Sequence, residues 1–344
     1  MEQGMNSTTF NTIGIPKRWR SKKAVAKRLA CDSEELIRIQ SDIHKIELYN
    51  RRSDVDNKIN LPCKTLYFRL ASTLESHSVS TALTGGNWLG QLNKSTAYSV
   101  LYFKLHFFWN YQFVVKGILK NENPPEKLGI FFYDEVEYMG WLFLLGQIEE
   151  AKVVARLIYA AIHRDYCMDF NDEYHRRGQM FMLRLFGKWQ DITIDFPNSA
   201  YDEPVYEWLL AHWDIADEQA LLPALIAASD RHTHQSWDDT NKANHDFHHI
   251  TLYRCPLELL MLFRLRALKG LKNPVVEHPL FDAPFDQLPE PQPVYIDDMM
   301  QATLKRVRED WPHYDKVLDD AITSPFTDAD YEFGKQYEQP SMTR

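Results

Sequence analysis

Apolar residues recur three or four positions apart along most of the chain, with polar residues between them. This spacing places the apolar residues on one face of a helix and predicts that most of the chain is helical. The ranges with this pattern are 33–50, 64–84, 94–119, 131–146, 149–165, 169–186, 201–212, 217–229, 239–269 and 296–321. The alternation typical of strands occurs only at 129–133 and 192–196, so we predict an all-α protein.

Two segments share one pattern that predicts a pair of helices. Residues 141–165 and 208–232 each begin with a Trp-led apolar stretch, break, restart with acidic residues and end in a second apolar helix. In the first segment Gly146 is suited to ending the leading helix, and Glu149 to beginning the next. Helices joined by such short connections pack as antiparallel hairpins. We therefore expect a multi-helix array of antiparallel helical hairpins in two related halves, although unrelated hairpins also resemble one another.

Shifts in composition divide the chain into five parts. They are a basic N-terminal arm (1–32), an N-terminal helical half (33–190), a C-terminal helical half (191–272), a Pro-rich linker or surface strap (273–295), and a C-terminal helix and tail (296–344). The first 30 residues carry seven Lys or Arg against a single acid, Glu2. Such an arm can contact nucleic acid, but no aromatic platform or recognition helix accompanies it, so we expect a solvated terminus.

The composition is that of an ordinary globular protein. Of 344 residues, 44% are hydrophobic and 25% charged, and no apolar run approaches the roughly 20 residues that span a bilayer. The start lacks the apolar region of a signal peptide, so we expect a cytoplasmic protein. Four scattered cysteines and the absence of GxGxxG, GxxxxGK[ST], GxSxG and HExxH motifs lead us to expect neither a cofactor nor enzymatic activity.

Charge is distributed unevenly along the chain, whose formal net charge is −9. Between Lys188 and Arg231 there is no Lys or Arg but nine acids, with Tyr201, Tyr206 and Trp213 among them. An acidic surface attracts a cationic protein and repels nucleic acid and anionic membrane. Aromatic side chains within a polar rim are typical of interface anchors. The alternative is that these acids cap helices and maintain solubility.

Residues 230–249 contain five of the thirteen histidines. If this stretch is helical, His245, His248 and His249 lie on one face, and with Asp246 they offer ligands for a metal ion. The adjacent His245 and Asp246 resemble the dyad of HD-type phosphohydrolases. A histidine beside an apolar helix more often hydrogen-bonds a carbonyl or carboxylate, so we favour a structural junction and keep a metal-dependent hydrolase as the alternative.

Two stretches carry a resemblance to a known family. YMGWLFLLGQIEEAKVVARLI (138–158) and EWLLAHWDIADEQALLPAL (207–225), with the apolar helix after His249, resemble the all-α immunity proteins of bacterial polymorphic toxin and type VI secretion systems. The likeness is greatest to the family that neutralises PoNe-type DNase toxins. It covers about residues 65–270 and departs from the family pattern at 248–260, where only Tyr253 and Glu258 are kept.

The resemblance implies an immunity protein that occludes a cognate toxin, such as a basic nuclease, without performing chemistry. Combined with the charge pattern, it gives as candidate partner-binding residues Asp202, Glu203, Tyr206, Glu207, Trp213, Asp214, Asp217 and Glu218, with Asp134, Glu135 and Glu137 as a second patch. The partner is then the toxin domain, not nucleic acid or membrane, and homodimerisation is left open. A helical scaffold or adaptor with several partners is a third reading.

Overall fold

The computed structural model of the chain describes residues 10, 12–30, 33–51, 61–119, 129–167, 170 and 176–327. Within these residues there are twelve α-helices and no β-strand, which confirms the predicted all-α class. The helices are α1 (Lys22–Leu29), α2 (Ser33–Arg51), α3 (Leu61–Leu83), α4 (Leu89–Leu119), α5 (Phe132–Leu144), α6 (Ile148–His163), α7 (Arg177–Trp189), α8 (Pro204–His212), α9 (Leu222–Gln235), α10 (Leu257–Leu268), α11 (Asp298–Asp310) and α12 (Tyr314–Thr323). No described helix is both long and apolar enough to cross a membrane.

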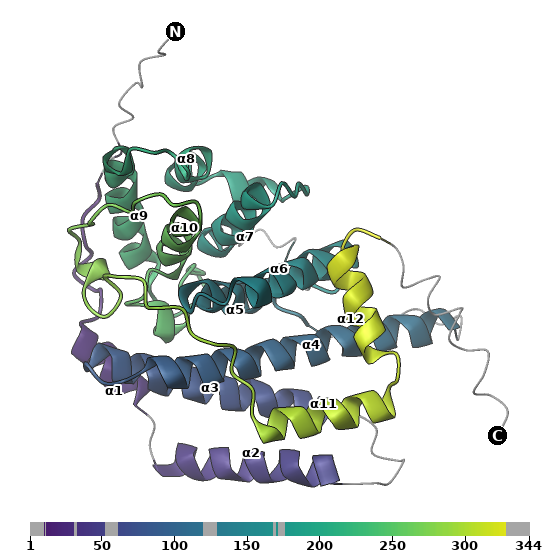
Figure 1. Cartoon of the computed structure of the whole chain (residues 1–344). Coiled ribbons are helices and arrows are strands. Elements are labelled where there is room, and N and C mark those ends of the chain that lie inside the picture. The colour runs from purple at the N-terminus through teal and green to yellow at the C-terminus, as the bar shows by residue number, and fades with distance from the viewer. Residues whose placement is uncertain are drawn as a thin grey trace, which may run out of the picture.

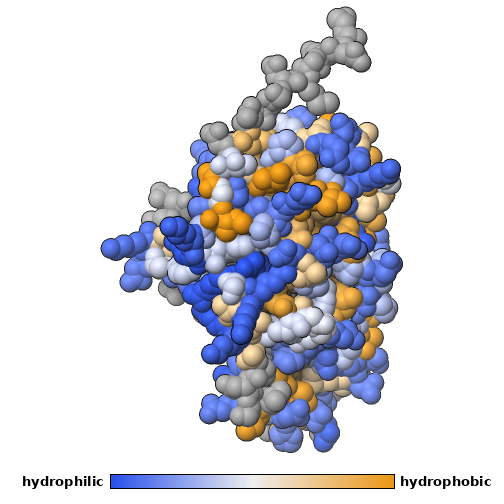
Figure 2. All heavy atoms as spheres, turned by 90° about the vertical axis from the view of Figure 1, so that its left-hand side faces the viewer, coloured by the Kyte–Doolittle hydropathy of each residue, from blue (hydrophilic) through white to orange (hydrophobic). Residues whose placement is uncertain are grey.

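The helices are arranged in stacked layers (Figure 1). The long helices α3 and α4 lie side by side, α2 packs on α3, and the α5–α6 hairpin lies above α4. Helices α7 to α10 form a group beyond α5. Helix α11 lies alongside α2, and α12 crosses α4 and α6. On the face where α1 lies, apolar residues occur in separate patches among hydrophilic ones (Figure 2).

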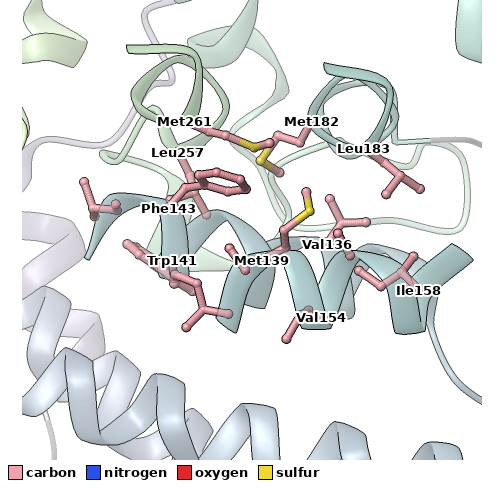
Figure 3. Close-up of a cluster of buried hydrophobic side chains, with 14 of the residues drawn as sticks. Val136, Met139, Trp141, Phe143, Val154, Ile158, Met182, Leu183, Leu257 and Met261 are labelled. Atoms are coloured by element: carbon pink, nitrogen blue, oxygen red, sulfur yellow. The ribbon is translucent and has the colours of Figure 1, made fainter. Parts of the chain in front are cut away.

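The centre of the core is α5, which packs against α4, α6, α7 and α10. Its side chains Met139, Trp141 and Phe143 are buried among residues of these neighbours, as Figure 3 shows. At Gly140 a Cβ atom would lie 2.8 Å from Cδ2 of Leu257, so a glycine is what allows α5 and α10 to approach this closely. Because α5 and α10 belong to the two predicted halves, the halves share one core, and their relatedness stays a prediction.

The predicted α5–α6 hairpin forms with nearly the expected ends. Gly146 has a φ of 72°, and its N–H and that of Gln147 donate to the carbonyls of Phe143 and Leu142. This left-handed C-terminal turn is the one for which glycine is suited.

Two long predicted helices are wrong. The range 239–269 is helical only from Leu257, because Pro256 stands at the start of α10 and residues 236–256 form turns. The range 296–321 is divided into α11 and α12. Pro312 forces Trp311 out of the helical region, to φ −138° and ψ 81°, which ends α11.

Other predicted boundaries differ by smaller amounts. Helix α7 begins at Arg177, and residues 169 and 171–175 of the predicted 169–186 helix lie outside the described residues. Neither strand candidate forms a strand: 192–196 is irregular, and in 129–133 only Ile130 makes an isolated bridge, with Cys167.

The N-terminal segment 12–30 is docked on the protein, which overturns our expectation of a solvated terminus. The N–H of Gly14 donates to the Asp230 carboxylate at 2.9 Å, and the indole N–H of Trp19 donates to the carbonyl of Tyr253 at 3.0 Å. The guanidinium of Arg254 stacks on Trp19, 3.5 Å from the ring centroid. Of its basic residues, Arg20 and Arg28 pair with Asp238, and Lys22 pairs with Asp282, so these three help to hold the segment in place.

The Pro-rich segment 273–295 lies along the surface as a strap. Arg264 donates to the carbonyl of Pro289 at 2.7 Å, and Asn93 donates to that of Pro293 at 2.8 Å. These bonds attach the strap to α10 and to α4, and so connect two layers of the structure.

Candidate functional site

The acids predicted to bind a partner are mostly paired with bases from other helices. The pairs are Asp202 with Arg177, Glu203 with Arg231, Glu207 with Arg184, and Asp214 with Lys269. Hydrogen bonds from Arg177 and Lys269 hold the pKa values of Asp202 and Asp214 below their usual range. Although this stretch of sequence contains no Lys or Arg, bases from other helices bring positive charge to its surface.

The two predicted aromatic anchors are buried, and the prediction that they contact a partner is wrong for this structure. Tyr206 and Trp213 are each 2% exposed. Tyr206 stacks on Phe181 with ring centroids 4.6 Å apart, and Lys269 covers Trp213. Both residues fall on the apolar face of α8 and its extension. Their helical spacing is the sequence signal that could have assigned them to the core.

A groove remains beside this stretch. It encloses about 450 Å³ between the end of α7, residues 191–196 and α8, and its lining includes Asp191, Phe196 and Tyr201. Tyr201 is 46% exposed and stacks on Arg184. Among the described residues, Asp191, Asp195, Asp217 and Glu218 take part in no ion pair, although Asp217 caps the following turn by accepting from the N–H of Gln219.

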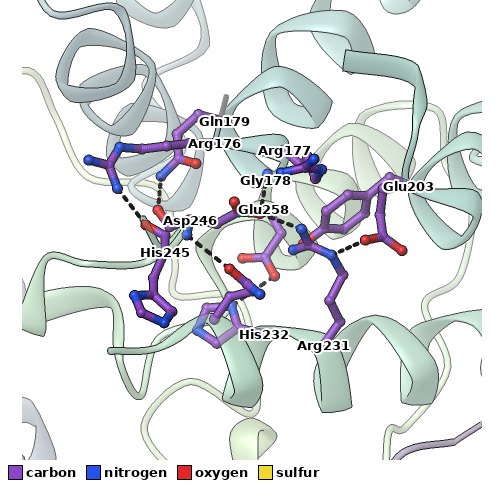
Figure 4. A network of polar contacts seen from close by, with 12 residues as sticks. Arg176, Arg177, Gly178, Gln179, Glu203, Arg231, His232, His245, Asp246 and Glu258 are labelled. Atoms are coloured by element: carbon purple, nitrogen blue, oxygen red, sulfur yellow. Dashed lines mark hydrogen bonds and ion pairs between the residues drawn. The ribbon is translucent and has the colours of Figure 1, made fainter. Parts of the chain in front are cut away.

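The predicted helical face of His245, His248 and His249 does not exist, because residues 236–249 contain no helix. Asp246 accepts from the N–H of Gly178 at 3.0 Å and pairs with Arg231 at 2.6 Å, and the His245 ring points away from it (Figure 4). The dyad of an HD-type hydrolase is therefore not assembled, and the predicted metal set His245, Asp246, His248 and His249 is dispersed.

The neighbouring His232 has the structural role that we favoured for this stretch. It is fully buried, with Nδ1 2.9 Å from the Glu258 carboxylate and Nε2 2.9 Å from the carbonyl of Leu252. Its ring also stacks on Phe247, with centroids 3.8 Å apart. These contacts tie α9 to α10 and to the turns between them.

His249 faces a different part of the molecule, where it meets two acids of α5. Its Nδ1 lies 2.7 Å from Oε2 of Glu137, and its Nε2 lies 3.5 Å from Oδ1 of Asp134. Ligand atoms of these three residues all lie within 4.8 Å of one another. The sequence had assigned Asp134, Glu135 and Glu137 to an exposed patch, but Glu135 and Glu137 are buried, so that assignment is wrong.

The three residues border a cavity of about 150 Å³ between α3, α4, α5 and the turn after His249. A third carboxyl, that of Glu75 on α3, also lines it, together with Ser72, Ser99, Tyr138 and Thr251. Sequence reasoning missed Glu75 because a single acid on a helix ordinarily faces solvent. The serines around it at helical spacing are the only local sign of a polar inner face.

Burial and mutual attraction set the charges in this cavity. Burial raises the pKa of Glu75 to about 7. Burial acts to lower the pKa of His249, but the Glu137 carboxylate outweighs it and raises the pKa to about 9. For Glu137 burial acts to raise the pKa, and the attraction of His249 holds it below its usual value. Near neutral pH one imidazolium thus compensates the carboxylates around it.

No protein-family model matches the chain, and neither the curated proteins nor the solved structures include a significant match. The groove and the cavity are therefore the features of the molecule from which a function can be inferred.

Proposed function

We propose that this protein is an immunity protein, which binds a cognate antibacterial toxin and neutralises it by occlusion. The observation that carries the proposal is the groove at the end of α7, together with the acids Asp191, Asp195, Asp217 and Glu218, which form no ion pair with the residues that the structure describes. Of these acids Asp191 lines the groove, whose wall also holds Arg184 and Lys188. An exposed Tyr beside carboxylates that form no ion pair favours a partner that presents Lys and Arg.

The proposal separates the acids of this region by their roles. Asp202, Glu203, Glu207 and Asp214 already hold bases of the same chain, so their contribution to a partner is small. The four acids that form no ion pair with a described residue are more available to an approaching cation, although Glu218 also attracts Arg266. A toxin that cleaves nucleic acid has such a cationic surface, because it must contact phosphates. The proposal includes a cytoplasmic location, where a nuclease reaches its substrate.

The test is a growth assay with the toxin domain encoded next to this gene, expressed alone or with this protein. We expect rescue by the unaltered protein and co-purification of the two chains. Reversing the charge of all four acids to Lys is expected to abolish rescue. The circular dichroism spectrum should stay that of the parent, and the melting temperature should fall by no more than the loss of the Asp217 cap implies.

The matched control reverses four exposed acids elsewhere that also form no ion pair, Glu277, Asp286, Glu290 and Asp319. Because both variants change the net charge equally, only a local role of the groove separates them. Rescue by the groove variant, or loss of rescue by the control, contradicts the assignment of this surface. Persistent toxicity with soluble unaltered protein contradicts the immunity function itself.

A further inference from the structure

We propose that Asp134, Glu137 and His249 bind a divalent transition-metal cation at the cavity between α3, α4 and α5, with Glu75 facing the ion from the opposite wall. This inference goes beyond the proposed immunity function and does not depend on it.

The three ligand groups come from elements that the fold holds firmly. Asp134 and Glu137 lie one helical turn apart on α5, so their carboxylates face the same side. His249 is brought to them by the turn at Ile250–Leu252, which packs against α3. Ligand atoms within 4.8 Å of one another can close around a single ion by side-chain rotation, in which His249 exchanges a carboxylate contact for the ion.

The Thr251 hydroxyl is a second, independent indication of a missing occupant. Thr251 lines the cavity and is only 6% exposed, and its Oγ1 makes no hydrogen bond of ordinary geometry, although it lies close enough to the Glu75 carboxylate to help lower its pKa. A buried hydroxyl without a well-placed partner is destabilising, because it has given up its hydrogen bonds to water. The cavity volume of about 150 Å³ accommodates an ion with several of its water ligands. A metal-bound water would give the Thr251 hydroxyl the partner that it lacks.

The donor set indicates the class of ion. One imidazole with two or three carboxylates suits Zn²⁺, Mn²⁺ or Fe²⁺, whereas Mg²⁺ and Ca²⁺ prefer ligand sets made of oxygen alone. An ion takes only one imidazole nitrogen of His249.

The experiment measures binding of ZnCl₂ and, separately, MnCl₂ to the chelator-dialysed full-length chain, by calorimetry and by elemental analysis after gel filtration. We expect one ion per chain. The variants His249→Gln and Asp134→Asn should each weaken binding by about tenfold or more. His245→Gln is the matched control, because His245 lies in the same segment but its side chain is not part of the cavity.

A cobalt titration gives a readout that a purely structural role of His249 would not produce. Visible absorption of bound Co²⁺ should appear with the unaltered chain and be lost in His249→Gln. Absence of stoichiometric binding, or equal affinities in Asp134→Asn and the control, would show that the His249–Glu137 pair is complete without metal and would overturn the proposal. Asp134 is partly exposed, so its variant remains informative should His249→Gln fail to fold.

Discussion

The acids beside α8 and the acids around the cavity compensate their charge in different ways. Beside α8, each of four carboxylates pairs with an Arg or Lys, and Arg231, the partner of Glu203, also pairs with another acid, Asp246. Around the cavity, Glu75, Asp134 and Glu137 have one His249 in their midst. Surface pairs contribute little to stability, whereas a buried carboxylate requires its partner. The number of acids in a region therefore says less about its function than the number of bases that reach it.

Arg231 links the acids beside α8 to the interior of the protein. Of the substitutions proposed, its removal should have the largest effect on the free energy of unfolding. It pairs with the buried Asp246 as well as with Glu203, and it lies over the Tyr206 ring. The substitution Arg231→Met leaves a buried carboxylate without a counter-charge and is expected to lower the free energy of unfolding by about 3–5 kcal/mol. Urea denaturation measures this value. A loss of less than about 1 kcal/mol would remove the distinction between buried and surface pairs.

A substitution of His249 tests directly how the carboxylates around the cavity depend on their cation. In metal-free protein near neutral pH, His249→Gln removes the ionic partner of the buried Glu137, which keeps only a hydrogen bond from Gln179. We expect a loss of about 1–3 kcal/mol in the same assay. Adding Glu137→Gln should recover part of it, because the uncompensated charge is then also removed. Strictly additive losses would mean that the two side chains do not depend on each other.

Asp238 extends the comparison to the docked N-terminal segment. Its ion pairs make the attachment of this segment depend on pH. Hydrogen bonds from Arg28 and from Tyr253 help to lower the pKa of Asp238. A lowered pKa in the folded state stabilises it above the unfolded value of about 3.9, and this contribution is lost as the pH falls through the folded value. The protection factors of residues 12–30 in hydrogen exchange, which correct for the intrinsic pH dependence of exchange, should therefore fall as the pH is lowered below about 3.9.

The Asp238→Asn variant should show the same faster exchange at neutral pH, confined to residues 12–30. Asp286→Asn, which removes an exposed acid with no ion pair, serves as the control and should leave exchange unchanged. Equal exchange in both variants would mean that apolar packing alone holds the segment.

Lys269 and Asp214 represent the surface pairs in their simplest form and should show the smallest effect. Both side chains are more than 40% exposed, at a distance of 2.8 Å. Either Lys269→Met or Asp214→Asn should change the free energy of unfolding by less than about 1 kcal/mol, and less still in high salt. A larger loss from Lys269→Met alone would point to its contact with the Trp213 ring.

The sequence predicted the helices well where spacing and end signals agreed. The range 149–165 became α6 because its apolar positions and Gly146 both favour that helix. The predictions for 239–269 and 296–321 failed because they gave apolar spacing more weight than the prolines. Pro256 stands at the start of α10, and Pro312 follows the end of α11.

The candidate sites were predictable only in their components. Asp134, Glu137 and His249 were each identified, but in two different groups, because only tertiary packing brings a turn after residue 248 onto α5. The negative charge of the surface beside α8 was overestimated for the same reason. Its compensating bases come from α7, α9 and α10, and linear charge counts do not include partners that are distant in sequence.

The attachment of residues 12–30 has a consequence for the order in which the chain matures. Trp19 and Arg28 bind residues that follow them by 234 and 210 positions. During synthesis at about 5–20 residues per second, this segment waits at least roughly ten seconds before its docking surface has been translated. Contacts of such long range also slow folding. Closure of this segment over α9 and the following turns is thus a late event, and a nascent chain exposes Trp19 until then.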